Sequence, residues 1–525
     1  SWLLSLNMTL ASLIAHLGLD ADCADRFPCL EVPRERLAEL VARAVNERHT
    51  PLSLMYATDE RAEHDAFFVH AVLAVDSEAG LLTLRSRLPA NDPTYPAVTK
   101  MVMAAHWYER LMGDQFGIIA QDHPDWRRLM HHSNVPLETY PLRKDFAWDT
   151  QLPYADEPYP MHVVEGEGIY EIPVGPIHAG IIEPGHFRFH VCGERILTLE
   201  GKLFFTHKGV EKLLEGRTPL EAMPLVEHIS GNMPVAHAIA FCEAAERISG
   251  TEIPERAAFL RTFWNELERV TMHIFDLGNI GGNGTGFTFM AAQGFRVVEQ
   301  LRRLGATLTG HRYLYGAVIP CGVSGDMSDL DIERTLEMLQ AIEQDWQETI
   351  KIAYATDGLM ERFETTGILK KRAAIAYGAQ GLPARASGVD RDLRRERPYA
   401  AYSQLPVNVI TRSDGDVCAR FDVRVLELAE SFRLLRECLV KLPEGPVSVA
   451  FEAQAGNAYG WAEGWLGEVL DWVRLDAEGR IERCVIRDPS FCNWPLFGEI
   501  GPGNIVPDFP LCNKSLNLSY SGTDM

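Results

Sequence analysis

Hydrophobic residues recur at two spacings along the chain, which predict helices and strands in different regions. After Pro254, apolar residues return every three or four positions, the period of a long helix with one buried stripe: Leu260, Phe263, Leu267, Val270, Ile274 and Leu277. A second helix is expected over residues 329–355, because Ser328 can cap its first turn. Residues 52–56 and 66–75 predict strands.

The two patterns divide the chain. Residues 34–145 mix a helix over 34–45 with strands and a turn at 78–80, while residues 148–168 are rich in Pro, Asp and Tyr and lack periodicity. A strand pair is expected in GERILTLEGKLFF (193–205) and a hairpin turn at 476–479, and the remainder is mainly helical. We predict an α+β domain over residues 1–150, a linker over 151–168, and a mainly helical domain with small peripheral sheets over 169–525.

Composition narrows the classes of function. The 525 residues are 46% hydrophobic, enough for two or more cores, and the net charge of -23 disfavours nucleic acid as a partner. Polar residues interrupt the apolar segment 2–19, so we expect an amphipathic helix there, neither a signal peptide nor a membrane anchor. The ten cysteines form no C-x-x-C pair, which suits reduced thiols in a cytoplasmic protein.

Two ordered sets of motifs carry a family resemblance. HWYERLMGDQFGIIAQDHPDWRRLM (106–130) and YPLRKDF (140–146) are similar to the signature of the 30 kDa subunit of respiratory complex I. Four later segments resemble the 49 kDa complex I subunit and the large subunit of group 4 nickel–iron hydrogenases: GPIHAGIIEPGHFRFHVCGE (175–194), FFTHKGVEKLLEGR (204–217), PERAAFLRTFWNELERVTMHIFDLGN (254–279) and PARASGVDRDLRRERPYAAY (383–402). The fused arrangement is nearest to the formate hydrogenlyase and hydrogenase-4 type. The resemblance implies an α+β module joined to a hydrogenase-like helical domain.

The chain departs from this family at the metal ligands. The family holds its nickel–iron centre with two C-x-x-C pairs, whereas HISGNMPVAH (228–237) and SLNLSYSGTDM (515–525) have other residues there: Ser230, Met233, Ser519 and Gly522. Asn517 replaces an Asp of the family, and Leu466 in EGWLG (463–467) takes the position of an arginine that overhangs the metal. Because such a centre needs deprotonated sulfur ligands, we expect no nickel–iron centre and no metal site in this chain.

Three titratable residues near these motifs are candidates for a proton path. Glu183 lies close to where hydrogenases place a proton-gating carboxylate, and a desolvated glutamate can relay protons. His186 is a candidate for the family's histidine facing the quinone headgroup, and His228 is expected to line the vacated cavity. Purely structural roles are the alternative. The family's quinone cavity uses a tyrosine where this chain has Gly231, so the resemblance leaves quinone binding open.

The resemblance implies a peripheral core subunit of a complex I-like oxidoreductase at the cytoplasmic face of the inner membrane, coupling electron transfer to ion translocation. Its expected partners are a small iron–sulfur subunit, a ferredoxin-like iron–sulfur subunit and antiporter-like membrane subunits. The [4Fe–4S] clusters would belong to those partners, and quinone is a further candidate ligand. Two alternatives stay open: a non-catalytic scaffold joining an iron–sulfur subunit to membrane subunits and, disfavoured by the missing thiolates, an active hydrogenase-4 or formate hydrogenlyase large subunit.

Overall fold

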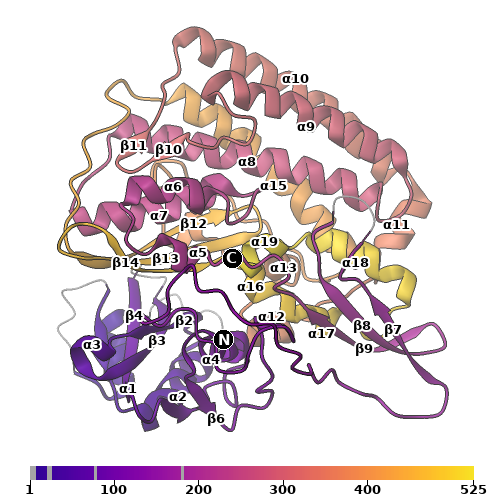
Figure 1. Ribbon diagram of the computed structural model, residues 1–525. Coiled ribbons are helices and arrows are strands. Elements are labelled where there is room, and N and C mark those ends of the chain that lie inside the picture. Colours follow the sequence, from indigo (N-terminus) through magenta and orange to yellow (C-terminus); the bar gives the residue numbers. More distant parts are fainter. Residues whose placement is uncertain (1–7, 21–26, 76–79, 179–181) are drawn as a thin grey trace.

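A four-stranded sheet organises the amino-terminal region of the computed structural model, which describes residues 8–20, 27–75, 80–178 and 182–525 (Figure 1). The strand order is β1-β4-β3-β2, and every residue of β2 and β3 is buried. The elements of this region are α1 (Leu10–Leu17), β1 (Cys29–Glu31), α2 (Arg34–Ala42) with a π-helical continuation (Arg43–Glu47), β2 (Leu52–Asp59), α3 (Arg61–His64), β3 (Ala66–Val75), β4 (Gly80–Pro89), β5 (Thr94–Pro96), α4 (His106–Phe116) and β6 (Ile119–Gln121). The predicted strands and the helix at 34–45 are confirmed.

Two expectations for this region fall partly outside the described residues. The turn expected at 78–80 includes residues 78 and 79, and the helix expected in 2–19 includes residues 2–7, and these residues lie outside the described part of the chain. Within the described part, that helix is α1, capped by the Thr9 hydroxyl and buried along Leu10, Leu13, Ile14 and Leu17. Among the described residues, no helix has the length and apolar content needed to cross a membrane.

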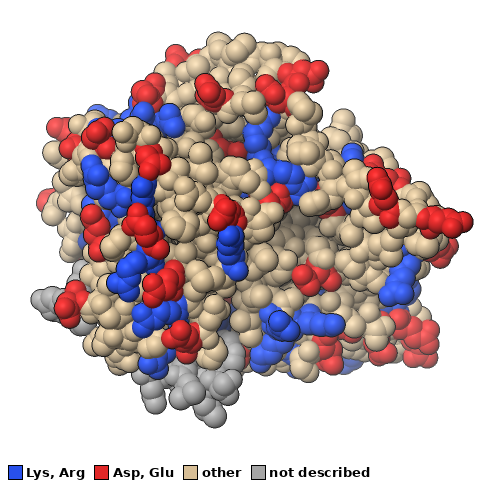
Figure 2. Space-filling model, turned by 90° about the horizontal axis from the view of Figure 1, so that it is seen from below, with Lys and Arg blue, Asp and Glu red and all other residues tan. Residues whose placement is uncertain are grey.

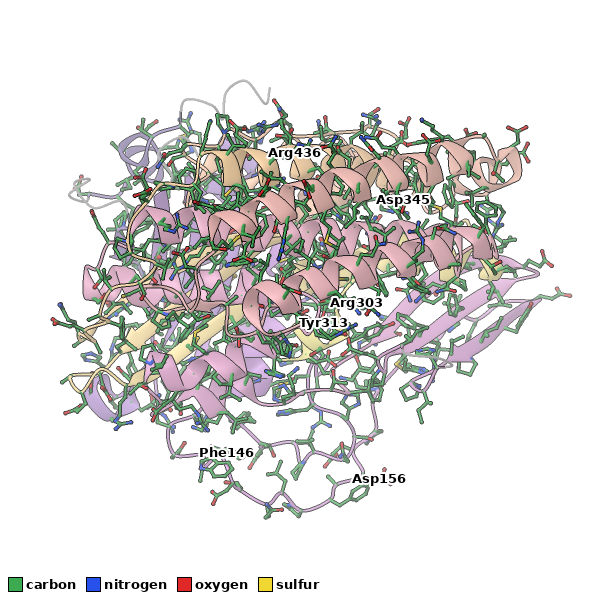
Figure 3. All side chains as sticks on the ribbon, turned by 90° about the horizontal axis from the view of Figure 1, so that it is seen from above. Phe146, Asp156, Arg303, Tyr313, Asp345 and Arg436 are labelled. Atoms are coloured by element: carbon green, nitrogen blue, oxygen red, sulfur yellow. The ribbon has the colours of Figure 1, made fainter. Side chains whose placement is uncertain are left out.

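A long irregular segment separates the first sheet from the second region of the chain. Residues 151–168, predicted as a linker, contain no helix or strand, and β7 begins at Ile169. Figure 3 shows this path, marked by Phe146 and Asp156, as a loop along the outside of the molecule. Arg127 fastens it by donating to the carbonyl of Pro160 at 2.9 Å.

Long helices form one layer of the second region, and small sheets flank them (Figure 1). The helices are α5 (Val210–Leu214), α6 (Pro219–Glu227), α7 (Pro234–Ser249), α8 (Glu255–Gly281), α9 (Thr288–Thr309), α10 (Asp329–Tyr354), α11 (Asp357–Phe363), α12 (Lys371–Ala376), α13 (Gly381–Ala386), α14 (Leu393–Glu396), α15 (Val417–Val440), α16 (Pro489–Asn493), α17 (Phe497–Ile500), α18 (Phe509–Leu516) and α19 (Tyr520–Asp524). The strands are β7 (Ile169–Val174), β8 (His186–Cys192), β9 (Arg195–Lys202), β10 (Val318–Ile319), β11 (Gly322–Val323), β12 (Gly456–Gly464), β13 (Gly467–Leu475) and β14 (Ile481–Arg487). The two predicted long helices and the hairpin at 476–479 are confirmed.

The segment 193–205 does not form the expected strand pair. Its alternating residues make the single strand β9, which pairs with the preceding β8 in the sheet β7-β8-β9. Gly193 has a φ of 61°, and with Glu194 it makes the turn between these two strands. The alternation correctly indicated a strand, but the position of its partner was wrong.

Helix α8 is buried around nearly its whole circumference, so the prediction of one buried stripe is wrong. It packs against α7, α9 and α15, and its polar residues are therefore also inside the protein. Arg261 is one that is stabilised there by pairing, because it forms an ion pair with Glu246 at 2.6 Å. The hydrophobic period identified the helix but could not show how many neighbours surround it.

The two regions share one core. Tyr459 of β12 places its hydroxyl 3.1 Å from that of Tyr56 in β2 and 2.9 Å from that of Thr83 in β4, and all three residues are buried. Nearby, Arg487 donates to the carbonyl of Ser53 at 2.8 Å. These buried hydrogen bonds fix the first sheet against the β12–β14 sheet.

Tyr459→Phe tests this junction. The ring is retained, but two buried hydroxyls lose their shared partner, so we expect a loss of about 1–2 kcal/mol in unfolding free energy, measured by chemical denaturation. Tyr154→Phe, at a tyrosine that is 82% exposed, is the control and should change nothing. Equal stability of the two variants would contradict the assigned role of this hydroxyl.

Candidate functional site

The structure brings together the four positions at which the family has cysteines. Ser230 lies between α6 and α7, and Met233 directly precedes α7. Ser519 caps the start of α19 with its side chain, and Gly522 lies within α19. The hydroxyls of Ser230 and Ser519 are buried and lie 2.9 Å apart, although 289 residues separate them in sequence. Ser519 also accepts the backbone N–H of Gly522 at 2.9 Å. The two segments therefore meet directly, where a vacated cavity was expected.

The side chains at these positions offer two hydroxyls and one thioether, and no thiolate. The Met233 sulfur packs so closely against Gly464 that a Cβ at Gly464 would lie 2.3 Å from it. A Cβ at Gly522 would lie 2.3 Å from an oxygen of Asp488, which also bonds to buried His237 at 3.0 Å. This donor set does not fit a nickel–iron cluster, which requires four sulfur ligands and the space between them.

The two neighbouring positions singled out in the sequence are also inside the protein. Asn517 ends α18 with a φ of 46°, and its amide donates to Asp276 at 2.5 Å. Asp276 in turn pairs with Arg424 at 2.9 Å. Burial raises the pKa of Asp276 to about 6, although Arg424 opposes this shift. Leu466 is fully buried, and its carbonyl leaves room only for a glycine at position 381.

The three candidate proton-path residues do not form one cluster. Glu183 is exposed and accepts the N–H of Ser521 at 3.2 Å. His186 lies in β8 with its Nδ1 3.2 Å from the carbonyl of Gly175, and among the described residues no hydrogen bond joins it to Glu183 or His228. His228 is exposed and bonds to the carbonyl of Pro224 at 2.6 Å, so the expectation that it lines a vacated cavity is wrong. As the residue that ends α6, it faces outward.

Glu268 is a buried carboxyl group near the site that the sequence did not reveal. It lies on α8, and one oxygen accepts the N–H of Val235, in the first turn of α7, at 2.8 Å. Its other oxygen has no hydrogen-bond partner among the described residues. Burial raises the pKa of Glu268 to about 8, although the backbone hydrogen bonds oppose this shift. Glu268 also lines a cavity of about 30 Å³ with Asn232 and Tyr313, large enough for one water molecule.

A larger cavity, of about 350 Å³, lies between the two regions. Aromatic rings of Trp107 and Trp494 form part of its wall, and charged side chains form another part. These charges are already satisfied: Arg127 pairs with Asp125 at 2.7 Å, and Lys202 donates to the carbonyl of His131 at 3.1 Å. The contact of Lys202, in β9, with His131 joins the two regions. Figure 2 shows acidic and basic side chains intermingled across the face of the molecule seen from below.

Comparisons with known protein families match successive parts of the chain, in the same order as the motifs found in the sequence. Residues 30–152 match the 30 kDa subunit of respiratory-chain NADH dehydrogenase, and residues 284–455 match its 49 kDa subunit. Residues 208–277, between them, match nickel-dependent hydrogenase.

Individual relatives cover most of the chain. Formate hydrogenlyase subunit 5 of Escherichia coli (strain K12) is 33% identical over 486 residues, 90% of this chain and 84% of that protein. Hydrogenase-4 component G of the same organism is 32% identical, over 90% and 83% of the two chains. A chain from the structure of the membrane-bound sulfane sulfur reductase, an archaeal respiratory membrane complex, superposes with a TM-score of 0.65 at 26% identity, over 68% of this chain and 99% of that one.

Glu268→Gln tests the buried carboxyl group. Glutamate has an ordinary pKa of 4.5, whereas that of folded Glu268 is about 8, so at pH values in between the folded state holds a proton that the unfolded state has released. Rising pH should therefore destabilise the wild type relative to the glutamine variant, by on the order of 3 kcal/mol between about pH 5 and pH 8. Urea denaturation at both pH values measures this difference.

The matched control for this experiment is Glu337→Gln, at an exposed glutamate of α10. It should follow the wild type at both pH values. A pH-independent difference between wild type and Glu268→Gln would contradict the raised pKa.

Proposed function

Because the chain belongs to the family of formate hydrogenlyase subunit 5 and hydrogenase-4 component G, with fused 30 kDa-like and 49 kDa-like complex I domains, we propose that it is a core peripheral subunit of a membrane-bound oxidoreductase. In this proposal the complex couples electron transfer to ion translocation and works without a nickel–iron centre. The main support for this proposal is a contact between the 228–233 loop and α19, where the hydroxyls of Ser230 and Ser519 lie 2.9 Å apart. In this proposal the chain retains the family's junction, with other residues in place of its sulfur ligands.

The chain would receive its electrons from other subunits. Its homologues belong to multi-subunit membrane respiratory complexes, and the described residues contain no group of three or more His, Cys, Asp or Glu side chains that could hold a metal ion. We propose that [4Fe–4S] clusters reside in a small iron–sulfur subunit and a ferredoxin-like subunit, and that antiporter-like membrane subunits carry the ions. The chain would then be peripheral, at the cytoplasmic face of the inner membrane.

The proposed electron acceptor is a small oxidised molecule bound near the 228–233 loop. Quinone is the first candidate, because relatives of this chain include NADH-quinone oxidoreductase subunits. A sulfane sulfur compound is the second, because the structural neighbour is named a sulfane sulfur reductase. Neither acceptor needs a nickel centre in this chain, and both need a hydrogen-bond donor beside an accessible space.

A scaffold without a reaction of its own is the second candidate function. The direct bond between Ser230 and Ser519 is equally compatible with a scaffold, because this contact fills the space between two of the proposed former ligand positions. A Glu183 variant distinguishes the redox function from the scaffold function. If it relays protons, Glu183→Gln should lower turnover in an assembled complex, whereas a scaffold should keep wild-type turnover.

Isolation of the native complex tests the assembly. With an affinity tag on this chain and mild detergent, we expect the chain to bring down a small iron–sulfur subunit, a ferredoxin-like subunit and antiporter-like membrane subunits, identified by mass spectrometry. An otherwise identical preparation from cells with the untagged chain is the control. A monomer recovered from membranes without such partners would overturn the proposed assembly.

Metal analysis of the same complex tests the proposal that the chain holds no nickel–iron centre. Hydroxyl and thioether groups cannot replace four thiolates, so we expect iron and acid-labile sulfide but far less than one nickel per chain by plasma mass spectrometry. An active nickel–iron hydrogenase purified in parallel is the control for nickel retention. About one nickel per chain that survives chelation would contradict the proposal.

A further inference from the structure

A turn from elsewhere in the chain is held against the 228–233 loop. Residues 310–316 connect α9 to β10, and the N–H of Gly316 donates to the carboxylate of Glu227, at the end of α6, at 2.6 Å. The Tyr315 ring lies 4.7 Å from the ring of His228, and its hydroxyl lies 3.5 Å from the carbonyl of Gly231. Figure 3 shows Tyr313, two residues earlier, beside Arg303 near the end of α9. The turn therefore borders the loop at its outer surface.

The loop lacks a side chain at the point that faces this turn. Gly231 is exposed, and a Cβ built on it would have only the Tyr315 hydroxyl within 4 Å, at 3.5 Å. One residue away, Ser230 is buried against Ser519. The Tyr315 hydroxyl thus lies beside the exposed backbone of Gly231, one residue along the chain from Ser230.

Hydrogen-bonding groups in this small region are left available to a ligand. The contact between Tyr315 and Gly231 is long, so the phenol proton is only weakly engaged. The Nδ1 atom of His228 is bonded to Pro224, and its Nε2 has no partner among the described residues. His311 stacks on Tyr315 at 4.6 Å with 11° between the rings, which adds a flat aromatic surface.

The phenol of Tyr315 is a donor at neutral pH. Burial raises its pKa, and the charges of nearby groups, first that of Glu227, raise it further. A tyrosine that stays protonated beside an open space can donate to an oxygen or sulfur atom of a bound molecule.

We propose that Tyr315, with His228 beside it, binds the electron acceptor over the 228–233 loop, the phenol donating a hydrogen bond to an acceptor atom of a small oxidised molecule. This inference rests on the proposed redox function. The atom that accepts the hydrogen bond would be a carbonyl oxygen of a quinone or a terminal sulfur of a polysulfide. Gly231 has no side chain, and the Tyr315 hydroxyl of the turn 310–316 places a polar group beside it.

Tyr315→Phe in the intact membrane complex tests the inference, because it removes the hydroxyl and keeps the stacked ring. The acceptor probes are decylubiquinone and polysulfide, assayed separately with reduced ferredoxin, freed of excess chemical reductant, as the electron donor and with the rate of an enzyme-free blank subtracted. We expect the KM for the true acceptor to rise about tenfold with a smaller change in kcat, as for the loss of one hydrogen bond to a bound ligand. A rise confined to one probe identifies the acceptor class.

Tyr313→Phe is the matched control, because Tyr313 belongs to the same turn but its hydroxyl accepts from Arg302 at 3.2 Å. It should leave both KM values unchanged. Tyr315→Phe combined with Gly231→Ser offers a rescue. Gly231 does not have the positive φ that disfavours a side chain, and a serine there would return a hydroxyl to the same space. Recovery of a low KM in this double variant would show that the hydroxyl, and not the fold of the turn, is required.

The outcomes separate the inference from the proposed function. An assembled wild-type complex that reduces neither probe would overturn the proposed function. If the wild type reduces a probe but Tyr315→Phe has the same KM, the assignment of Tyr315 is overturned and the redox function stands. Equal KM changes in the Tyr315 and Tyr313 variants would also overturn the assignment, because they would indicate a general disturbance of the turn.

Discussion

The mutual neutralisation of buried charges is the constraint on which the second region depends. Arg385 lies between two carboxylates, 2.6 Å from Glu427 and 2.8 Å from Glu463, and Glu427 also bonds to His273 at 3.0 Å. Although burial raises the pKa of Glu427, the charge of Arg385 holds it below its usual range. Removing one partner from such a group costs roughly 3–5 kcal/mol, because a charge is left without compensation. The network ties α8, α13, α15 and β12 into one arrangement.

That arrangement also determines where the candidate site lies. Helix α8 carries both His273 of the network and Glu268, whose carboxyl group meets the first turn of α7 at Val235. The start of α7 adjoins the 228–233 loop, and the loop meets α19 through Ser230. A chain of contacts thus runs from the charged centre of the protein to its accessible surface at Tyr315. The site is positioned by rigid helices, which suits a binding surface that must keep its geometry.

Local patterns in the sequence predicted the elements well but not their surroundings. The helix beginning after Pro254, the cap at Ser328 and the turn after Asp476 depend on neighbouring residues, and all three were found. The burial of α8 and the partner of β9 depend on contacts between distant segments, and these were misjudged. The resemblance singled out Ser230 and Ser519 but led to the expectation of a vacated cavity, whereas their hydroxyls are in direct contact. Glu268 and Tyr315 were missed because no local pattern marks them.

The placement of α19 has a consequence for how the protein is made. Asp524 accepts the N–H groups of Phe204 and Thr206 at 2.9 and 3.0 Å, so this late segment lies at the centre of the molecule (Figure 1). Residues 519–525 are synthesised after Phe204, Thr206 and Ser230, the groups that they contact. A nascent chain that lacks this segment leaves the 204–206 backbone and Ser230 without their partners, and must wait for it before the site can close. The backbone at 204–206 and the Ser230 hydroxyl therefore reach their final hydrogen bonding only once α19 has docked.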